Sequence, residues 1–333
     1  MTTPAARARA TRIYVAATLL LLLITALATL TLGKLGIPFH DIPAAFLGET
    51  QGKTAFVFEK LRGPRLATAL CAGALLGISG ALFQSVTHNP LGSPDVIGLG
   101  AGAGAGAAIS VLAFPTLPTA FGAIAGAGLA TLLVFISTGR GFTSPHRTII
   151  AGISVAALAY AITEYVVSTQ LRESASQLAA YLVGSLNASN IQDITIGVCA
   201  LAVVLPASLA LSTNATFLNM GDHAAQSVGV DPARTRTYAI LLSVIAAGSA
   251  VAIAGPIAFI ALAAPHIARK ATKTSHINVC TSGLTGALLL TFADLVAQHF
   301  PPLKGLPVGV ITLGIGGAYL GYLLIHEQAK GKI

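Results

Sequence analysis

Residues 212–236 read STNATFLNMGDHAAQSVGVDPARTR and form a polar island between two long apolar runs. The pattern predicts a short helix inside a loop. Asn219 is placed to cap the start of this helix, and Gly229 is placed to end it. Asp231-Pro232 has the sequence of a cap followed by the first residue of the next helix. The island holds no nucleophile–base pair and no metal-ligand spacing, so it is better suited to docking than to chemistry.

The composition of the chain excludes an ordinary soluble protein. It has 333 residues, of which 54% are hydrophobic and 9% are charged, and its mean hydropathy is +0.80. Soluble domains average about 25% charged residues, so most of this chain is expected to avoid water. The net charge of +8 is spread between apolar runs, which predicts contact with membrane lipid and no nucleic-acid partner. The three cysteines lie in separate apolar runs, so we expect no disulfide, no metal site and no cofactor.

Long apolar stretches predict an all-α integral membrane protein. A helix needs roughly 20 apolar residues to cross about 30 Å of hydrocarbon. Ten stretches are candidates, although the eighth is short as a strict apolar run and borrows from its neighbour, and we treat residues 1–333 as one transmembrane domain. The boundary between the seventh and eighth stretches, at Gly255-Pro256, is the least defined. The expected spans are 13–33, 66–84, 93–113, 118–138, 148–168, 191–211, 237–255, 257–268, 278–297 and 307–325.

The positions of Lys and Arg predict how the chain is oriented, because these residues are enriched in cytoplasmic loops. With the N-terminus inside, 12 of them face the cytoplasm and 7 face outward. This orientation places both termini and the polar island, with its coupling segment at 213–236, on the cytoplasmic side of the cell membrane. The seven expected outside are Lys34, Lys53, Lys60, Arg62, Arg65, Arg172 and Lys304.

Glycines repeat at four-residue spacing within several expected spans. Such ridges let helix backbones approach closely in lipid. The pattern therefore predicts a crowded helix bundle. The repeats are Gly73 and Gly77, then Gly98, Gly102 and Gly106, and finally Gly122 and Gly126.

The sequence Arg62-Gly63-Pro64-Arg65 opens the second expected span from the outer side. One interpretation is a pair of arginines whose charges extend to the membrane interface. The other is a docking point for an acidic partner, because arginine offers a planar fork to carboxylates.

Two further stretches interrupt the apolar pattern at prolines. His88-Asn89-Pro90-Leu91-Gly92-Ser93-Pro94 cannot continue a helix, and either a tight turn or a broken segment lining a path would explain it. The run 255–269 has Pro256 near one end and Pro265 near the other, and His266 and Arg269 then emerge on the cytoplasmic side.

Enzymatic function is poorly supported by the sequence. The stretch 48–54, GETQGKT, has three residues between its glycine and the Gly-Lys pair, whereas a phosphate loop has four. An ion-coupled secondary transporter is the alternative class of function. Such a protein buries ionisable residues near the middle of the membrane, and only Glu164 and Asp294 approach that position here.

Several stretches together resemble the iron-chelate permease family (FecCD type), which includes the vitamin B12 permease. The similarity extends over roughly residues 13–325. It rests on RGPR at 62–65, GALLGISGALFQ at 73–84, NPL with Pro94, YLVGSL at 181–186 without the family's usual preceding Trp, FLNMGDHAAQSVGV in the island, GPIAFIALAAPHIAR at 255–269 and LPVGVITLGIGGAYLGYLL at 306–324.

The resemblance implies a type II ABC importer permease with ten spans, which pairs with a second permease. Two cytoplasmic ATPases dock on the pair, and an extracytoplasmic binding protein delivers a metal chelate, with a ferric siderophore the expected cargo. Arg62 and Arg65 correspond to arginines that meet carboxylates of the binding protein. The residues implied to contact the ATPase are Asn219, Gly221, Asp222, Ala225, Gln226, Val228 and Gly229. Those implied to line or gate the translocation path are Gln84, Asn89, Pro90, Pro256, Pro265 and His266.

Two positions depart from the family pattern. The family usually has Arg after the Asp of span nine, where this chain has Gln298 after Asp294. The family usually has Glu before Leu-Pro, where this chain has Gly305. A heterodimer whose other permease supplies the missing charges is one explanation.

Overall fold

The computed structural model describes residues 4–114, 116–138, 145–169, 181–274 and 278–328, and these residues form helices and turns without any strand. The all-α prediction is confirmed. The island helix is α10 (Asp222–Ser227). The long helices are α1 (Pro4–Thr31), α4 (Gly63–Thr87), α5 (Leu99–Ala113), α6 (Thr119–Ser137), α7 (Pro145–Thr169), α9 (Ile191–Leu218), α11 (Pro232–Ala254), α12 (Ile260–Thr272), α13 (Val279–His299) and α14 (Val308–Gln328).

Seven helices of the described chain are long and apolar enough to cross a membrane, namely α1, α4, α6, α7, α9, α11 and α13. Helices α5 and α14 are apolar but shorter in their apolar part, and α12 has 13 residues. The count of ten spans therefore stays a prediction. Two expected spans begin too early, because residues 93–98 form a turn and the 3-10 helix η3 (Pro94–Ile97), and residues 255–259 are not helical.

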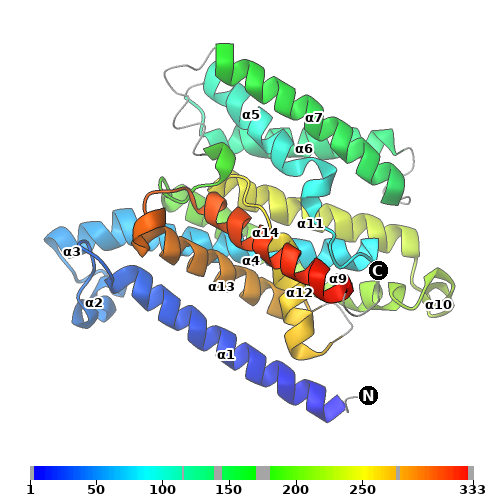
Figure 1. The fold of residues 1–333 in the computed structure, drawn as a ribbon, viewed down its shortest axis with the longest axis horizontal. Helices are drawn as coiled ribbons and strands as arrows, with labels where there is room; N and C mark the ends of the chain where they lie inside the picture. The colour runs from blue at the N-terminus through cyan, green and yellow to red at the C-terminus, as the bar shows by residue number, and fades with distance from the viewer. Residues whose placement is uncertain (1–3, 115, 139–144, 170–180, 275–277, 329–333) are drawn as a thin grey trace.

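Helix α4 is the centre of the bundle. It packs against α13, α11, α9 and α12, and 83% of its apolar window is buried, compared with 28% or less in α1, α6, α7 and α9. Helices α5, α6 and α7 form a layer on one side, and α1 lies along the opposite side (Figure 1). An all-apolar helix that is buried on every face is expected at the core of such a bundle.

The glycine ridges bring helix backbones close together, as their spacing predicted. A Cβ at Gly77 of α4 would lie 2.1 Å from the carbonyl oxygen of Ser282 in α13. A Cβ at Gly126 of α6 would lie 2.1 Å from the carbonyl oxygen of Gly102 in α5. Only glycine allows backbones to approach this closely, which gives van der Waals contact where lipid offers no hydrophobic driving force.

The segment that we expected as one long loop, 34–65, is partly helical. It contains η1 (Phe39–Asp41), α2 (Ile42–Phe46), α3 (Gly52–Phe56) and the π-helix η2 (Val57–Arg62), which leads directly into α4. Pro64 has no N–H, and its ring would clash with the carbonyl four residues earlier. A widened turn just before the proline relieves this clash and so explains the π-helix.

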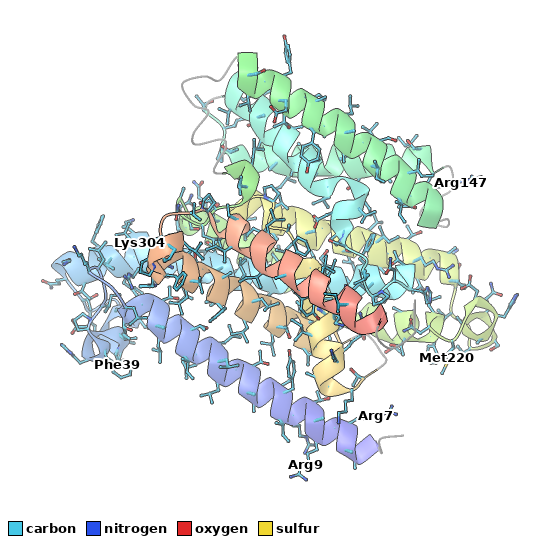
Figure 2. All side chains as sticks on the ribbon, in the orientation of Figure 1. Arg7, Arg9, Phe39, Arg147, Met220 and Lys304 are labelled. Carbon is cyan, nitrogen blue, oxygen red and sulfur yellow. The ribbon has the colours of Figure 1, made fainter. Side chains whose placement is uncertain are left out.

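The two ends of the bundle carry different residues. The start of α1, the end of α14 and α10 lie at one end, whereas α2 and α3 lie at the other (Figure 1). Figure 2 places Arg7, Arg9, Arg147 and Met220 at the first end and Phe39 and Lys304 at the second. This separation agrees with the sidedness that the Lys and Arg positions predict. Among the residues used for that prediction, Arg140, Arg172, Lys330 and Lys332 lie outside the described residues.

Candidate functional site

The island forms a short helix that projects from the bundle between α9 and α11. Ala225 is fully buried and belongs to the main hydrophobic cluster, so it anchors α10 to the bundle. Met220 is 73% exposed and Val228 is 56% exposed, and Gln226 between them is also exposed. An exposed apolar pair around a polar side chain is typical of a protein contact surface.

The capping of this helix differs from the prediction at one end. Asn219 caps the C-terminus of α9, which continues through residues expected to be loop. Thr216 lies in this continuation of α9, and its Oγ1 donates to the Ser212 carbonyl oxygen at 2.7 Å. The residue that precedes α10 is Gly221, with φ +101°. Gly229 follows the end of α10 with φ +82°, as predicted. The Asp231 carboxylate accepts from the Arg234 N–H at 3.1 Å, and Pro232 opens α11, which is also as predicted.

An ion pair joins α10 to α11. Arg236 donates from Nη2 to Asp222 Oδ1 at 2.6 Å and from Nη1 to Asp222 Oδ2 at 2.9 Å. These hydrogen bonds lower the pKa of the Asp222 carboxyl below its ordinary value. A two-bond fork of this kind fixes orientation as well as distance. The pair therefore ties α10 to the first turns of α11.

His88 connects the end of α4 to the same region. It has φ +50° and caps α4, and its Nε2 lies 3.2 Å from the carbonyl oxygen of Leu218, the last residue of α9. The sequence placed His88 in an interrupted stretch without assigning it a partner. Its positive φ, which is uncommon outside glycine, is the structural sign that the chain turns sharply here.

Arg62 and Arg65 lie at the other end of the bundle, and both make internal contacts. Arg65 donates from Nη2 to Asp294 Oδ1 at 2.6 Å and from Nη1 to Asn187 Oδ1 at 2.6 Å. Asp294 is 1% exposed and also accepts from Gln298 Nε2 at 2.7 Å. Arg62 donates from Nη2 to the carbonyl oxygen of Leu32 at 2.5 Å and from Nη1 to that of Thr29. The docking role of these two arginines stays a prediction.

The residues expected to line a path are distributed over several places. Gln84 is 2% exposed and links α4 to α12, because it donates to the Leu262 carbonyl at 3.0 Å and accepts from Arg269 at 2.5 Å. Asn89 and Pro90 form an exposed turn, in which Asn89 Oδ1 accepts from the Leu91 N–H at 2.9 Å.

The other three expected path residues belong to the 255–269 run. Pro265 is buried within α12. The His266 ring faces the Tyr319 ring of α14 with centroids 6.1 Å apart. Pro256 lines a cavity of about 450 Å³ between α5, α7 and the start of α14.

This cavity, which we call the central cavity, has polar groups that the sequence did not single out as a site. Tyr160, Thr163 and Glu164 of α7 line it together with Asp95 of η3. Asp95 accepts from Ser93 Oγ at 2.9 Å. Carboxylates within apolar runs are rare and usually functional, and Asp95 directly after Pro94 was such a signal in the sequence.

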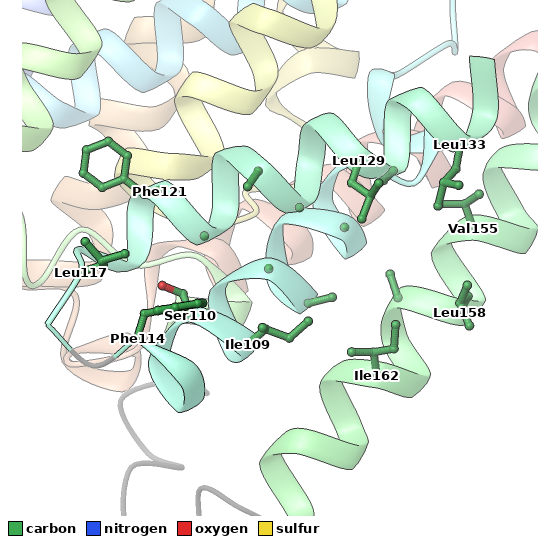
Figure 3. A pocket seen from close by; sticks show the side chains of 18 residues that line it. Ile109, Ser110, Phe114, Leu117, Phe121, Leu129, Leu133, Val155, Leu158 and Ile162 are labelled. Atoms are coloured by element: carbon green, nitrogen blue, oxygen red, sulfur yellow. The ribbon is translucent and has the colours of Figure 1, made fainter. Parts of the chain in front are cut away.

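A second cavity, of about 400 Å³, is unsuited to a polar cargo. It lies between α5, α6 and α7 (Figure 3). Ile109, Phe114, Leu129 and Ile162 are among its walls, and Ser110 contributes its one polar side chain. Hydrocarbon walls cannot pair with the oxygen atoms of a chelate.

Three irregular segments meet beside the central cavity, in what we call the glycine junction. The Ser185 N–H donates to the Ala254 carbonyl at 2.9 Å, and the Gly309 N–H donates to the Gly184 carbonyl at 3.0 Å. A Cβ at Gly309 would lie 1.6 Å from the Val183 carbonyl oxygen, and one at Gly255 would lie 2.3 Å from that of Tyr181. The junction therefore joins the end of α11, the segment before α9 and the start of α14 by main-chain contacts.

The Arg65–Asp294 pair yields a stability prediction. Arg65→Gln leaves a buried carboxylate without its cation, and breaking a buried pair costs about 3 kcal/mol or more. We expect a clear decrease in the midpoint of thermal unfolding in detergent. The control is Arg65→Gln with Asp294→Asn, which removes both charges and should recover part of the loss. An Arg65→Gln protein as stable as the parent would contradict this account.

Comparison with known proteins gives consistent matches. Residues 20–326 match the model of the FecCD transport family. The chain is 38% identical over 301 residues to the ferric enterobactin transport system permease protein FepG of Escherichia coli K12, covering 90% of this chain and 91% of FepG. It is 32% identical over 322 residues to the ferric enterobactin transport system permease protein FepD of the same organism, covering 94% of this chain and 95% of FepD.

A solved structure has the same fold. It is an inward-facing conformation of a metal-chelate type ABC transporter, with a TM-score of 0.82 and 26% sequence identity. The alignment covers 95% of this chain and 99% of that structure.

Proposed function

Because the chain belongs to the FecCD transport family, we propose that it is the membrane-spanning permease subunit of an ABC importer for a ferric siderophore. The siderophore cargo rests on relatives such as FepG, whose name gives ferric enterobactin as its substrate. The observation that carries the proposal is α10, a small helix that is anchored at Ala225 and presents an exposed surface. The chain itself does no bond chemistry in this proposal, and ATP is hydrolysed in separate subunits.

In this proposal α10 and its flanking residues form the surface on which the ATPase docks. Met220, Gln226 and Val228 are the exposed side chains that meet it, and Gly221 and Gly229 allow the sharp turns on either side. Asn219, Asp222 and Ala225 hold the surface in place. In the proposed orientation, α10 and both termini face the cytoplasm and the α2–α3 end faces outward.

The mechanism follows the mechanical connections of α11. Closure of the ATPases displaces α10, and the Asp222–Arg236 pair passes the displacement to the start of α11. The other end of α11 is part of the glycine junction, where Ala254 accepts from Ser185. A rigid helix converts a push at one end into movement at the other, so ATP binding rearranges the wall of the central cavity. Of the residues expected along the path, Pro256 lines this wall. Gln84 ties α4 to α12, Pro265 and His266 lie in α12, and the turn at Asn89–Pro90 lies at the cytoplasmic end of α4.

A second permease subunit is expected beside this chain. FepD and FepG are both named as permease proteins of one ferric enterobactin system, and this chain is similar to both. We therefore propose a heterodimer, and purification of a complex with a single kind of permease chain would contradict it.

ATP-driven uptake tests the proposal. The transporter complex is reconstituted in vesicles with the binding protein outside and radiolabelled ferric siderophore as cargo. We expect uptake that requires both ATP inside and the binding protein, and that continues when ion gradients are collapsed. Uptake driven by a proton or sodium gradient without ATP would instead favour the ion-coupled alternative.

A further inference from the structure

Two neighbouring cavities of opposite character meet at Phe121 of α6. One is the cavity of about 400 Å³ between α5, α6 and α7, which we call the hydrocarbon cavity. The other, which we call the polar pocket, has a volume of about 540 Å³ and lies between the start of α6, the start of α9 and the end of α11. Phe121 lines both, and Figure 3 shows it beside Leu117 at one end of the hydrocarbon cavity.

Three side chains of the polar pocket keep hydrogen-bonding groups that the chain does not use. Ser189 and Thr195 are not among them, because their hydroxyls donate to main-chain carbonyl oxygens at 3.0 and 2.9 Å. Within the described ranges, the Thr119 hydroxyl and the Gln192 side-chain amide make no hydrogen bond, and Asp193 accepts a main-chain N–H at Oδ2 only. No Lys, Arg or His is among the described residues that line the pocket. The pocket therefore combines one carboxylate with two neutral donors.

The hydrocarbon cavity extends along α6 away from the polar pocket. Its α6 lining runs from Phe121 to Leu133, a length of about 18 Å at 1.5 Å per residue. This length is close to one leaflet, which is half of a hydrocarbon core of about 30 Å. The polar pocket lies at the end of the bundle opposite α10, because the start of α9 and the end of α11 form it. Its polar groups are thus at the depth of lipid headgroups, and the hydrocarbon walls are at the depth of acyl chains.

The helices around both cavities present apolar side chains to the bilayer. Helices α6, α7 and α9 bury only 28%, 22% and 17% of their apolar windows within the chain. Phe121 is 59% exposed, Leu129 is 58% exposed, and Ile191 at the start of α9 is 70% exposed. In a membrane-spanning protein such surfaces contact lipid. The occupant that matches a polar pocket joined to a hydrocarbon cavity is therefore an amphipathic lipid.

We propose that the two cavities together bind one phospholipid with an ethanolamine head. One acyl chain lies in the hydrocarbon cavity, and the head lies in the polar pocket. The phosphate accepts hydrogen bonds from the Thr119 hydroxyl and the Gln192 amide, and the ammonium group pairs with the Asp193 carboxylate. A phosphoglycerol head has no cation and would bring its negative charge close to Asp193. The inference requires only that the chain spans a membrane, so it does not depend on the cargo.

Native mass spectrometry of the intact chain, purified in detergent, tests the proposal. The chain is incubated with equal amounts of phosphatidylethanolamine and phosphatidylglycerol that carry the same acyl chains. We expect one retained lipid per chain and a preference of about fivefold or more for the ethanolamine head, which Asp193→Asn should remove. Ala125 is exposed and lines the hydrocarbon cavity. Ala125→Phe fills this cavity and should lower retention of both lipids about tenfold or more.

Two control variants make the same kinds of change outside both cavities. Glu59 is exposed in η2 at the same end of the bundle, and Glu59→Gln removes one carboxylate there. Gly128 is exposed on α6, and a Cβ at this position would meet nothing within 4 Å, so Gly128→Phe adds the aromatic ring without filling a cavity. Both controls should retain lipid as the parent does, with the same preference for the ethanolamine head.

A further variant keeps the test decisive if Asp193→Asn loosens the start of α9, where Asp193 belongs to the capping box. Thr119→Val lies on α6 and removes only a phosphate donor, so it should weaken retention of both lipids about threefold. A parent chain that retains neither lipid would overturn the proposal, as would equal retention by Ala125→Phe and the parent. An unchanged headgroup preference in a folded Asp193→Asn chain would also overturn it, because the head would then lie outside the polar pocket.

Discussion

Gln226→Arg is expected to abolish ATP-driven uptake and binding-protein-stimulated ATPase activity while leaving membrane insertion intact. Gln226 is exposed between Met220 and Val228, so an arginine there meets the partner surface and not the permease core. An unpaired charge buried in an interface costs about 3 kcal/mol, which is more than a hundredfold in affinity. Co-purification of the ATPase with the permease measures this loss directly.

The control for this variant is Ala8→Arg. Ala8 is exposed on α1 between Arg7 and Arg9, which lie at the same end of the bundle as Met220 (Figure 2), and the substitution adds the same charge outside the coupling segment 213–236. We expect near-normal uptake from it. Normal transport by Gln226→Arg would show that α10 is not the surface that the ATPase holds.

Gly126→Leu is expected to prevent α5 and α6 from packing, and it carries the largest predicted loss of stability. The new side chain would begin 2.1 Å from the Gly102 carbonyl oxygen and 2.8 Å from Gly106 Cα. Both are backbone atoms, so no side chain can move aside. Overpacking of this severity exceeds the usual 1–3 kcal/mol, and we expect little monodisperse protein on size-exclusion chromatography.

Gly128→Leu on the same helix is the matched control. A Cβ at Gly128 would meet nothing within 4 Å, so the same substitution two residues away should leave yield and thermal midpoint nearly unchanged. If both variants fold equally well, the close approach of α5 and α6 is not required for the fold.

The sequence predicted the helices better than their ends. Apolar length located α6 and α13 to within two residues, because burial in lipid and burial in protein impose the same requirement. Apolar length did not predict that residues 52–62 are helical, because Lys53, Glu59 and Lys60 are polar and a π-turn has no sequence period of its own. It ended α9 at residue 211, whereas the helix continues to Leu218, because polar residues at a helix end read as loop.

The candidate site was predictable in its position and less so in its contacts. The turn at Gly229 and the Asp231–Pro232 start follow from local backbone preferences, which a sequence displays. The Asp222–Arg236 and Arg65–Asp294 pairs join residues 14 and 229 positions apart. Such partners depend on how the helices cross. The fold alone revealed that Arg62 and Arg65 are occupied by contacts within the chain.

The glycine junction has a consequence for the cell that contains this transporter. Its three segments touch through main-chain atoms at Gly184, Gly255 and Gly309, and these contacts do not depend on side-chain rotamers. Protons and small ions could pass the junction only when these backbone segments separate. A membrane that contains many copies of the resting transporter should therefore keep its membrane potential. Vesicles that contain the resting complex and a potential-sensitive dye should lose their potential no faster than vesicles without the complex.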